Sequence, residues 1–293
     1  MAPRLNNAAI LGEREIALLE REVNRGLPPR CMFAPYTLPV EAFYLETPDG
    51  NLVHACRLGR DSDRAVILCH GFGGNKNIRN FVALAQFLSR LCTVYTFDFR
   101  GHGLSPGPST FGVLEAMDLG AVVEEARARG ASRLAAVGLS MGGVVIIRYA
   151  ALHGKLDSLV VISAPADLWA SRAPGARLIR LLLGTSLGRR LATLRYGVSL
   201  DGSWKKALQP IDLVPLVYPQ PITIIHGEDD FVFEPRQAEL LARRAPGNCR
   251  LHILPGFGHA EMGYGPALLS ILLDTLNRDL GLDPWEAFYR RDR

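Results

Sequence analysis

The chain has 293 residues, of which 48% are hydrophobic and 21% charged, a composition typical of a globular protein with one large domain or two small ones. Its formal net charge of +4 is mildly basic, and no dense block of Lys and Arg is present, so we do not expect nucleic acid as a partner. Every apolar run ends before the length of about 18 residues that a transmembrane helix needs, and the N-terminus lacks the apolar core of a secretory signal. We therefore expect a cytoplasmic protein.

The cysteines give no sign of a disulfide framework. They are odd in number, scattered along the chain and without a C-x-x-C pair. We expect reduced, mostly buried thiols at Cys31, Cys56, Cys69, Cys92 and Cys249.

The N-terminal region precedes the main fold. Residues 11–25 mix leucine and isoleucine with Glu and Arg, a pattern typical of an amphipathic helix, and a Gly and a Pro-Pro pair follow it. We assign residues 1–39 to this helix and an extended lead-in. Apolar runs then flank Pro48-Asp49-Gly50, which predicts a β-hairpin with strands over 40–47 and 52–58.

From residue 65 the chain alternates between short apolar runs and helical stretches. The predicted strands cover residues 65–69, 93–97, 134–137, 159–163, 222–225 and 250–254. The predicted helices cover residues 78–91, 112–129, 142–153, 235–244 and 266–280, and a charged tail follows over 281–293. Near-continuous apolar strands that alternate with helices indicate a parallel sheet buried on both faces.

One interval breaks this alternation. Nearly 60 residues separate the strand that ends at Ser163 from the strand that begins at Ile222, which is too long for a simple crossover. We interpret residues 166–205 as a small helical cap inserted into a core of residues 40–165 and 206–280. The cap is expected to lie over the C-terminal ends of the strands, where open α/β sheets bind ligands.

The predicted cap is basic. Its two helical stretches, 176–183 and 187–194, carry or adjoin the arginines Arg172, Arg177, Arg180, Arg189, Arg190 and Arg195. These form either a solvated helix face or a contact surface for an anionic membrane or an acidic substrate. As a hypothesis, an acyl pocket lies beneath them, lined by Leu178, Ile179, Leu181, Leu182 and Leu183.

The sequence Gly138-Leu139-Ser140-Met141-Gly142 lies between a predicted strand and a predicted helix. A Gly-x-Ser-x-Gly turn in that place is typical of a nucleophile elbow, in which small flanking residues leave the serine hydroxyl exposed. Five residues alone are a weak signal, because the pattern also arises by chance. We take Ser140 as the candidate nucleophile because further signals follow in the right order.

A serine hydroxyl needs a base, and the base needs an acid that holds it in one tautomer. His259 follows the last predicted strand directly and is the candidate general base. Three adjacent carboxylates, Glu228-Asp229-Asp230, follow the preceding predicted strand. We choose Asp230 as the acid and keep Asp229 as the alternative. The order Ser140, Asp230, His259 is that of nucleophile, acid and base in α/β hydrolytic enzymes.

The oxyanion that forms on attack needs two preorganised N–H donors. The backbone N–H of Met141, at the start of the elbow helix, is the first candidate. The second is the N–H of Phe72 in the glycine-rich segment His70-Gly71-Phe72-Gly73-Gly74, whose glycines let the backbone approach a substrate. This segment lacks the glycine spacing of phosphate-binding loops.

Taken together, the motifs resemble the α/β-hydrolase fold family over about residues 40–280. The motifs are His70 to Gly74, Asp98-Phe99-Arg100-Gly101-His102-Gly103-Leu104-Ser105, Gly138 to Gly143, His226 to Asp230 and Gly258-His259. The branch that it most resembles holds lysophospholipase-like and monoacylglycerol-lipase-like esterases and serine aminopeptidase relatives. The resemblance implies a mostly parallel central sheet with helices on both faces and a small inserted cap. It also implies a structural, noncatalytic role for Asp98, Arg100, His102 and Ser105.

These observations predict a serine hydrolase that cleaves small-molecule carboxylic esters through an acyl-enzyme, with no metal and no cofactor. A thioesterase, a peptidase for small amides, a carbon–carbon hydrolase or an acyltransferase would use the same three residues. A binding protein that resembles hydrolases is the alternative outside enzymes. Weak contact of the basic cap with an anionic membrane is a further hypothesis, and the sequence leaves the oligomeric state open.

Overall fold

The computed structural model describes residues 34–201, 207–260 and 265–283. The predicted helix over 11–25, Cys31 and most of the charged tail lie outside these ranges. Within them, no helix is long and apolar enough to cross a membrane.

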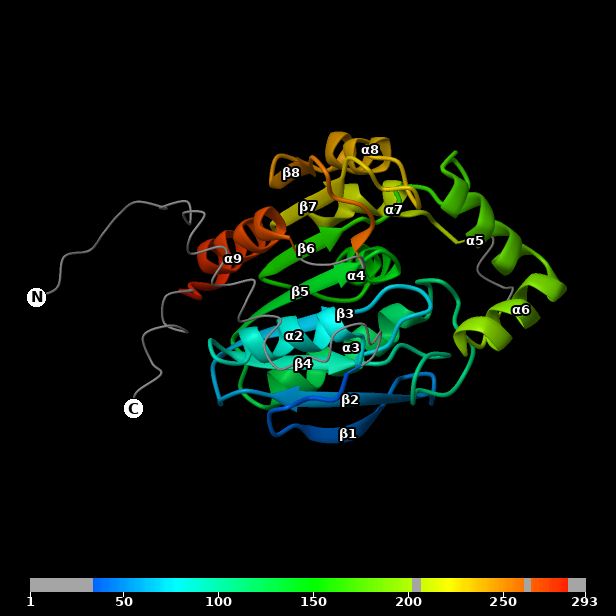
Figure 1. The fold of residues 1–293 in the computed structure, drawn as a ribbon. Coiled ribbons are helices and arrows are strands. Elements are labelled where there is room, and N and C mark those ends of the chain that lie inside the picture. Colours follow the sequence, from blue (N-terminus) through cyan, green and yellow to red (C-terminus); the bar gives the residue numbers. More distant parts are fainter. Residues whose placement is uncertain (1–33, 202–206, 261–264, 284–293) are drawn as a thin grey trace, which may run out of the picture.

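The described residues form an eight-stranded sheet (Figure 1). Its strands are β1 (Glu41–Glu46), β2 (Leu52–Leu58), β3 (Arg64–Cys69), β4 (Thr93–Phe97), β5 (Arg133–Leu139), β6 (Ser158–Ile162), β7 (Ile222–Gly227) and β8 (Cys249–Leu254). They lie in the order β1-β2-β4-β3-β5-β6-β7-β8. The hairpin β1–β2 is antiparallel and joins β4 antiparallel, whereas β4, β3, β5, β6, β7 and β8 run parallel. This confirms the predicted mostly parallel sheet.

Helices cover both faces because alternate strand residues point to opposite sides. On one face, Ile67 and Cys69 share a core with helices α3 (Glu115–Ala128), α4 (Met141–Leu152) and α8 (Arg236–Arg244). On the other face, Val66 and Leu68 pack with α2 (Arg79–Leu88) and α9 (Pro266–Leu280). A short helix α7 (Pro210–Leu213) and the 3-10 turn η2 (Val214–Val217) precede β7 and were not predicted.

Two helices, α5 (Pro174–Gly184) and α6 (Ser186–Tyr196), lie between β6 and α7 and stand away from the sheet, at the right of Figure 1. Their inner sides bury Ala176, Leu183 and Ala192. Of the leucines assigned to an acyl pocket, Leu178 is 52% exposed and Leu181 is 59% exposed. Because more than half of each of these two side chains is exposed, neither lines an enclosed pocket in the structure.

The thiols that the structure describes are free. Cys56, Cys69 and Cys92 are buried and Cys249 is half-buried. Burial raises the pKa of the Cys92 thiol to about 12 and that of Cys69 well above its ordinary value, so neither is a reactive thiolate at neutral pH.

Glu234, at the start of the α8 segment, fastens the entrance to the cap. Its carboxylate accepts hydrogen bonds from Ser171 Oγ at 2.6 Å, Arg172 N at 3.2 Å and Ala173 N at 3.2 Å. Although burial acts to raise the pKa of Glu234, these bonds and one from Gln237 lower it to about 2.

We expect Glu234→Gln to loosen the cap. A carboxyl group whose folded-state pKa lies below its unfolded value of about 4.5 stabilises the fold above that pH and loses this effect as pH falls. The Tm of Glu234→Gln should thus be lower than that of the wild type at pH 7, and the difference should shrink between about pH 4.5 and 2. Thermal unfolding across this pH range is the measurement, and limited proteolysis of the cap at pH 7 should be faster in the variant. A difference in Tm that does not change with pH would contradict the assignment.

Candidate active site

Ser140 lies at the sharp turn between β5 and α4. Its backbone φ of 51° and ψ of −113° lie outside the regions that non-glycine residues favour, a strain expected where a turn presents a functional side chain. The turn is possible because Gly142 lacks a Cβ, which would lie 2.3 Å from the carbonyl oxygen of Cys69 and 2.9 Å from that of His70. The same close approach seats the start of α4 against the end of β3.

Asp230 and His259 are brought together by the loops that follow β7 and β8. Asp230 Oδ2 lies 2.8 Å from His259 Nδ1, and both side chains are buried. The two loops meet at Gly227, where a Cβ would lie 2.1 Å from the carbonyl oxygen of Phe257. Asp229, the alternative acid, is exposed and does not bond to His259 in the structure. The geometry thus favours Asp230.

Further hydrogen bonds hold the Asp230 carboxylate in place. Its Oδ1 accepts the backbone N–H groups of Val232 at 2.8 Å and Phe233 at 3.0 Å. Its Oδ2 also lies 3.3 Å from Nε2 of the buried His226. Burial acts to raise the pKa of Asp230, but the bonds to His226 and His259 outweigh it and hold this pKa well below the ordinary value. Asp230 is therefore a carboxylate at neutral pH.

His226 is a residue whose role the sequence analysis missed. Its Nε2 lies 2.8 Å from the carbonyl oxygen of Phe233 as well as near Asp230. Since both neighbours are acceptors, we assign the proton to Nε2. His226 is the next-to-last residue of β7 and was visible only as part of the His226 to Asp230 motif, where its spacing of four residues from Asp230 was the available signal.

Two backbone N–H groups at the site have no acceptor. Among the described residues, neither the N–H of Phe72 nor that of Met141 donates a hydrogen bond. Buried or partly buried N–H groups are normally paired, so these two are free to donate to a bound ligand. The contact of Gly142 with Cys69 and His70 places the elbow next to the segment that carries Phe72.

Most of the sequence matches the model of a known protein family. The sequence model of the Alpha/beta hydrolase family matches residues 66–267. The chain belongs to the alpha/beta hydrolase family. The match includes Phe72, Ser140, Asp230 and His259. A comparison with curated protein sequences finds no match.

Solved structures show the same fold as this alpha/beta hydrolase. The Pyrococcus furiosus esterase Pf2001 is 21% identical, with a TM-score of 0.69 over 87% of this chain and 100% of that chain. GrgF from Penicillium sp. sh18, an alpha/beta hydrolase, is 18% identical, with a TM-score of 0.65 over 83% and 100%. XC6422 from Xanthomonas campestris, described as a serine hydrolase without a lid, is 22% identical, with a TM-score of 0.57 over 84% and 97%. At sequence identities of 18–22%, the structural similarity shows a shared fold.

In this alpha/beta hydrolase, two neutral histidines support the segment that carries Phe72. His102 Nε2 accepts the N–H of Gly73 at 3.2 Å, and His70 Nε2 accepts that of Phe99 at 3.0 Å. Burial, with a smaller effect from His102, lowers the pKa of His70 to about 3, and burial also lowers that of His102. Both rings therefore remain acceptors at neutral pH, and they fix the backbone next to the Phe72 N–H.

The remaining polar residues of the Asp98 to Ser105 segment make structural contacts. Asp98 accepts Lys76 Nζ at 2.5 Å, and Ser105 Oγ donates to the Asp98 carbonyl oxygen at 2.6 Å. Arg100 donates to Asp118 Oδ1 at 2.7 Å and to both carboxylate oxygens of Asp49. These bonds join the β1–β2 turn, the segment after β4 and α3.

We expect Arg100→Met to lower the free energy of unfolding by about 3–5 kcal/mol, because Asp118 would be left buried without its hydrogen-bonding partner. The corresponding fall in Tm is roughly 6–20 °C. Activity per folded molecule should stay within about threefold, since Arg100 does not touch the site. Denaturant unfolding measures the free energy of unfolding. Arg243→Met, which breaks the exposed pair with Glu239, should change the unfolding free energy by less than about 0.5 kcal/mol, and an equal loss in both variants would contradict a buried network.

Ser140, Asp230 and His259 all lie at the C-terminal edge of the parallel strands, after β5, β7 and β8. Of these three, the structure joins Asp230 and His259 by a hydrogen bond, and within the described residues no such bond joins Ser140 to His259. In unliganded sites the bond between nucleophile and base is often long and tightens when substrate binds. No cluster of three or more His, Cys, Asp or Glu residues suited to a metal occurs in the part of the chain that the structure describes.

Proposed function

We propose that this alpha/beta hydrolase is a serine hydrolase that cleaves carboxylic esters through an acyl-enzyme. The observation that carries the proposal is the buried Asp230–His259 pair at the strand edge that also carries Ser140 in its strained turn. A binding protein would not need a carboxylate, an imidazole and a strained serine at one edge.

The pairing fixes the role of each ring nitrogen of His259. Since Nδ1 faces the Asp230 carboxylate at 2.8 Å, it carries the proton and donates, which leaves Nε2 unprotonated and able to act as a base. In the first step Nε2 accepts the proton of the Ser140 hydroxyl while Oγ bonds to the ester carbonyl carbon. The N–H groups of Phe72 and Met141 hold the negative oxygen of the tetrahedral intermediate.

The intermediate then collapses. The bond between carbon and the alcohol oxygen breaks, the alcohol leaves with the proton from His259, and the acyl group stays on Ser140. A water molecule gives a proton to His259 and attacks the acyl carbon, and the acid leaves as Ser140 regains its proton. No step needs a metal ion or an organic cofactor.

The test is a substrate panel with a shared acyl group and different leaving groups: ethyl ester, ethyl thioester and ethyl amide. We expect the ester to have the highest kcat/KM, because its alkoxide leaves with the proton that His259 delivers. A thioester preferred by tenfold or more would instead indicate a thioesterase. Absence of turnover with all three substrates, in protein shown to be folded, would overturn the proposed function.

A further inference from the structure

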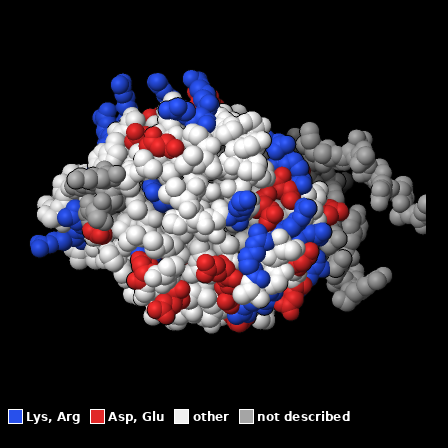
Figure 2. All heavy atoms as spheres, turned by 180° about the vertical axis from the view of Figure 1, so that it is seen from behind, with Lys and Arg blue, Asp and Glu red and all other residues white. Residues whose placement is uncertain are grey.

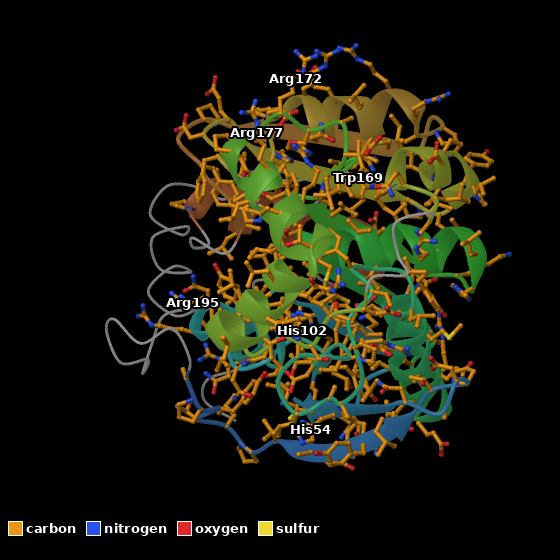
Figure 3. All side chains as sticks on the ribbon, turned by 90° about the vertical axis from the view of Figure 1, so that its right-hand side faces the viewer. His54, His102, Trp169, Arg172, Arg177 and Arg195 are labelled. Carbon is orange, nitrogen blue, oxygen red and sulfur yellow. The ribbon has the colours of Figure 1, made fainter. Side chains whose placement is uncertain are left out.

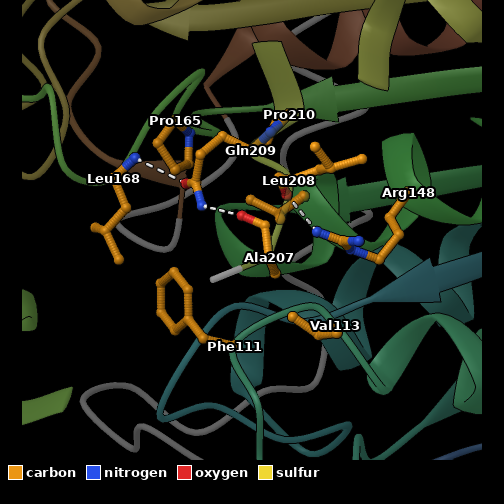
Figure 4. Close-up of a pocket in the computed structure, with 10 residues that line it drawn as sticks. Phe111, Val113, Arg148, Pro165, Leu168, Ala207, Leu208, Gln209 and Pro210 are labelled. Carbon is orange, nitrogen blue, oxygen red and sulfur yellow. Dashed lines mark hydrogen bonds between the residues drawn. The ribbon is translucent and has the colours of Figure 1, made fainter. Parts of the chain in front are cut away.

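A small pocket adjoins the proposed catalytic residues and contains one charged side chain. It has an empty volume of about 320 Å³, including its open mouth, and Figure 4 shows the residues that line it. They are Phe111, Val113, Val144, Arg148, Pro165, Leu168, Ala207, Leu208, Gln209 and Pro210. Most are apolar, and the Gln209 side chain is already engaged with the backbone of Leu168 and Ala207.

The pocket connects to the proposed oxyanion site on two sides. Val144 lies one helical turn after Ser140 on α4, and Arg148 lies one turn further, about 12 Å from Ser140 along the helix axis. On the other side, the Phe111 ring packs against that of Phe72, with a centroid distance of 5.5 Å. A substrate at Ser140 can therefore place one of its groups in this pocket.

Arg148 lacks a countercharge of its own. Arg148 is only 7% exposed. It forms no ion pair within the described part of the chain, and its Nε has no hydrogen-bond acceptor. Its Nη2 donates a hydrogen bond to the Leu208 carbonyl oxygen, drawn as a dashed line in Figure 4. Glu115 is the carboxylate whose charge acts on Arg148, but it accepts its hydrogen bonds from Ser109, Thr110 and Gly112.

A buried guanidinium with free donors in an apolar pocket is a binding partner for a carboxylate. We propose that this pocket binds the anionic end of the substrate, so that the preferred esters carry a carboxylate on the group that enters it. The inference rests on the proposed esterase activity and names a substrate class for it. Arg148 would bind substrate directly through charge-assisted hydrogen bonds.

The test compares p-nitrophenyl monoesters of linear dicarboxylic acids of about 6–10 carbons with the matching esters that end in a carboxamide. For the wild type we expect kcat/KM to be about 10- to 100-fold higher for one carboxylate ester than for its carboxamide analogue, the range of one charged hydrogen-bonded contact. Arg148→Met should lose this preference, because its kcat/KM should fall far more for the carboxylate ester than for the carboxamide ester. Arg148→Lys keeps the charge and should keep part of the preference, and Arg243→Met on the surface of α8 is the matched control.

Equal rates for the two esters in the wild type, or a preference that survives in Arg148→Met, would overturn the subsite. Hydrolysis of the carboxamide ester reports the proposed esterase activity separately. If that analogue is cleaved without any carboxylate preference, the subsite fails and the esterase assignment stands.

The cap helices α5 and α6 carry exposed leucines, which support a separate inference. On α6, Leu187, Leu191 and Leu194 recur at helical spacing and are 66%, 49% and 83% exposed. Leu178 and Leu181 on α5 are exposed as well. Isolated exposed leucines are ordinary, but five on two adjacent helices form an apolar surface that calls for a partner.

The charges around these leucines are of one sign. Residues 168–200 contain six arginines and no Asp or Glu. Figure 3 looks onto this end of the molecule and shows Arg172, Arg177 and Arg195 on it, together with Trp169. On the rear face, Figure 2 shows basic and acidic groups close together at the end of the body away from the cap. Exposed leucines on a segment whose only charged residues are arginines fit the headgroup region of an anionic bilayer.

We infer that the outer face of α5 and α6 docks on anionic lipid surfaces. The test is co-sedimentation with vesicles of phosphatidylcholine alone and with 30% phosphatidylglycerol, about a physiological anionic fraction. We expect binding to the anionic vesicles only, weakened by salt. Arg190→Gln with Arg195→Gln should weaken it by about fivefold per charge, and serine at Leu187, Leu191 and Leu194 should abolish it.

The matched control is Leu216→Ser, which removes an exposed leucine outside the cap and should bind as the wild type does. Equal binding to both vesicle types, or none to either, would overturn the inference. So would a concentration-dependent dimer that the serine variant abolishes, because the leucine face would then be an interface between two copies of the chain.

Discussion

Asp230→Asn is expected to lower kcat/KM for ester hydrolysis by about 10⁴-fold, the loss typical when the acid of such a triad becomes an amide. Asparagine can present its N–H₂ group to His259 Nδ1, and the ring would then keep its proton on Nε2, where the base is needed. Steady-state kinetics with a p-nitrophenyl ester measure the effect.

Asp229→Asn provides the matched control, because it makes the same chemical change one residue away on an exposed side chain. Its kcat/KM should stay within about twofold of the wild-type value. Partial unfolding of Asp230→Asn would also lower its activity, so the Tm of both variants is measured alongside the kinetics. A large loss in Asp229→Asn with little loss in Asp230→Asn would contradict the assignment of the acid.

Ser140→Ala and His259→Ala are each expected to lower kcat by roughly 10⁴- to 10⁶-fold, and the double variant should be no slower than either. The effects do not add because the hydroxyl and its base act as one unit: once the nucleophile is gone, the base has no proton to remove. Residual turnover would come from the free N–H groups of Phe72 and Met141. Losses that multiply in the double variant would indicate that the two residues act independently.

Much of the fold could be predicted from the chain because its parallel strands are buried on both faces. The run at residues 93–97 is β4 without a shift of boundary, and the last helix occupies residues 266–280 as predicted. Most other boundaries moved by one to three residues, and the largest shifts are at helix ends: α2 ends at Leu88 rather than 91, and α3 begins at Glu115 rather than 112. The short α7 and η2 were missed because four residues are too few to show a helical period.

The inner face of α5 could not be read from the sequence. Leucine or isoleucine occupies positions 178, 179, 181, 182 and 183, which lie all round the helix, so the pattern marks no single buried side. The structure buries Leu183 and leaves Leu178 and Leu181 exposed. Which side faces inward depends on contacts with the body, such as those that Arg180 makes with the carbonyl oxygens of Leu168 and Ser171.

The choice among the three carboxylates after β7 also depended on tertiary structure. The sequence places Glu228, Asp229 and Asp230 at a strand end but gives no reason to separate them other than loop direction. Burial separates them, because only Asp230 is turned inward toward His259 and His226. The Arg148 pocket had no sequence signal, since its walls come from four separate segments of the chain.

The most direct test of a hydrolytic site at Ser140 is labelling with a fluorophosphonate probe, read by intact mass and peptide mapping on wild type and Ser140→Ala. The probe reacts only with an activated serine and presumes no substrate. One adduct on the wild type, mapped to Ser140 and absent from the variant, is the predicted result. A folded wild-type protein that stays unlabelled, or an adduct that persists in Ser140→Ala, would contradict the proposed mechanism.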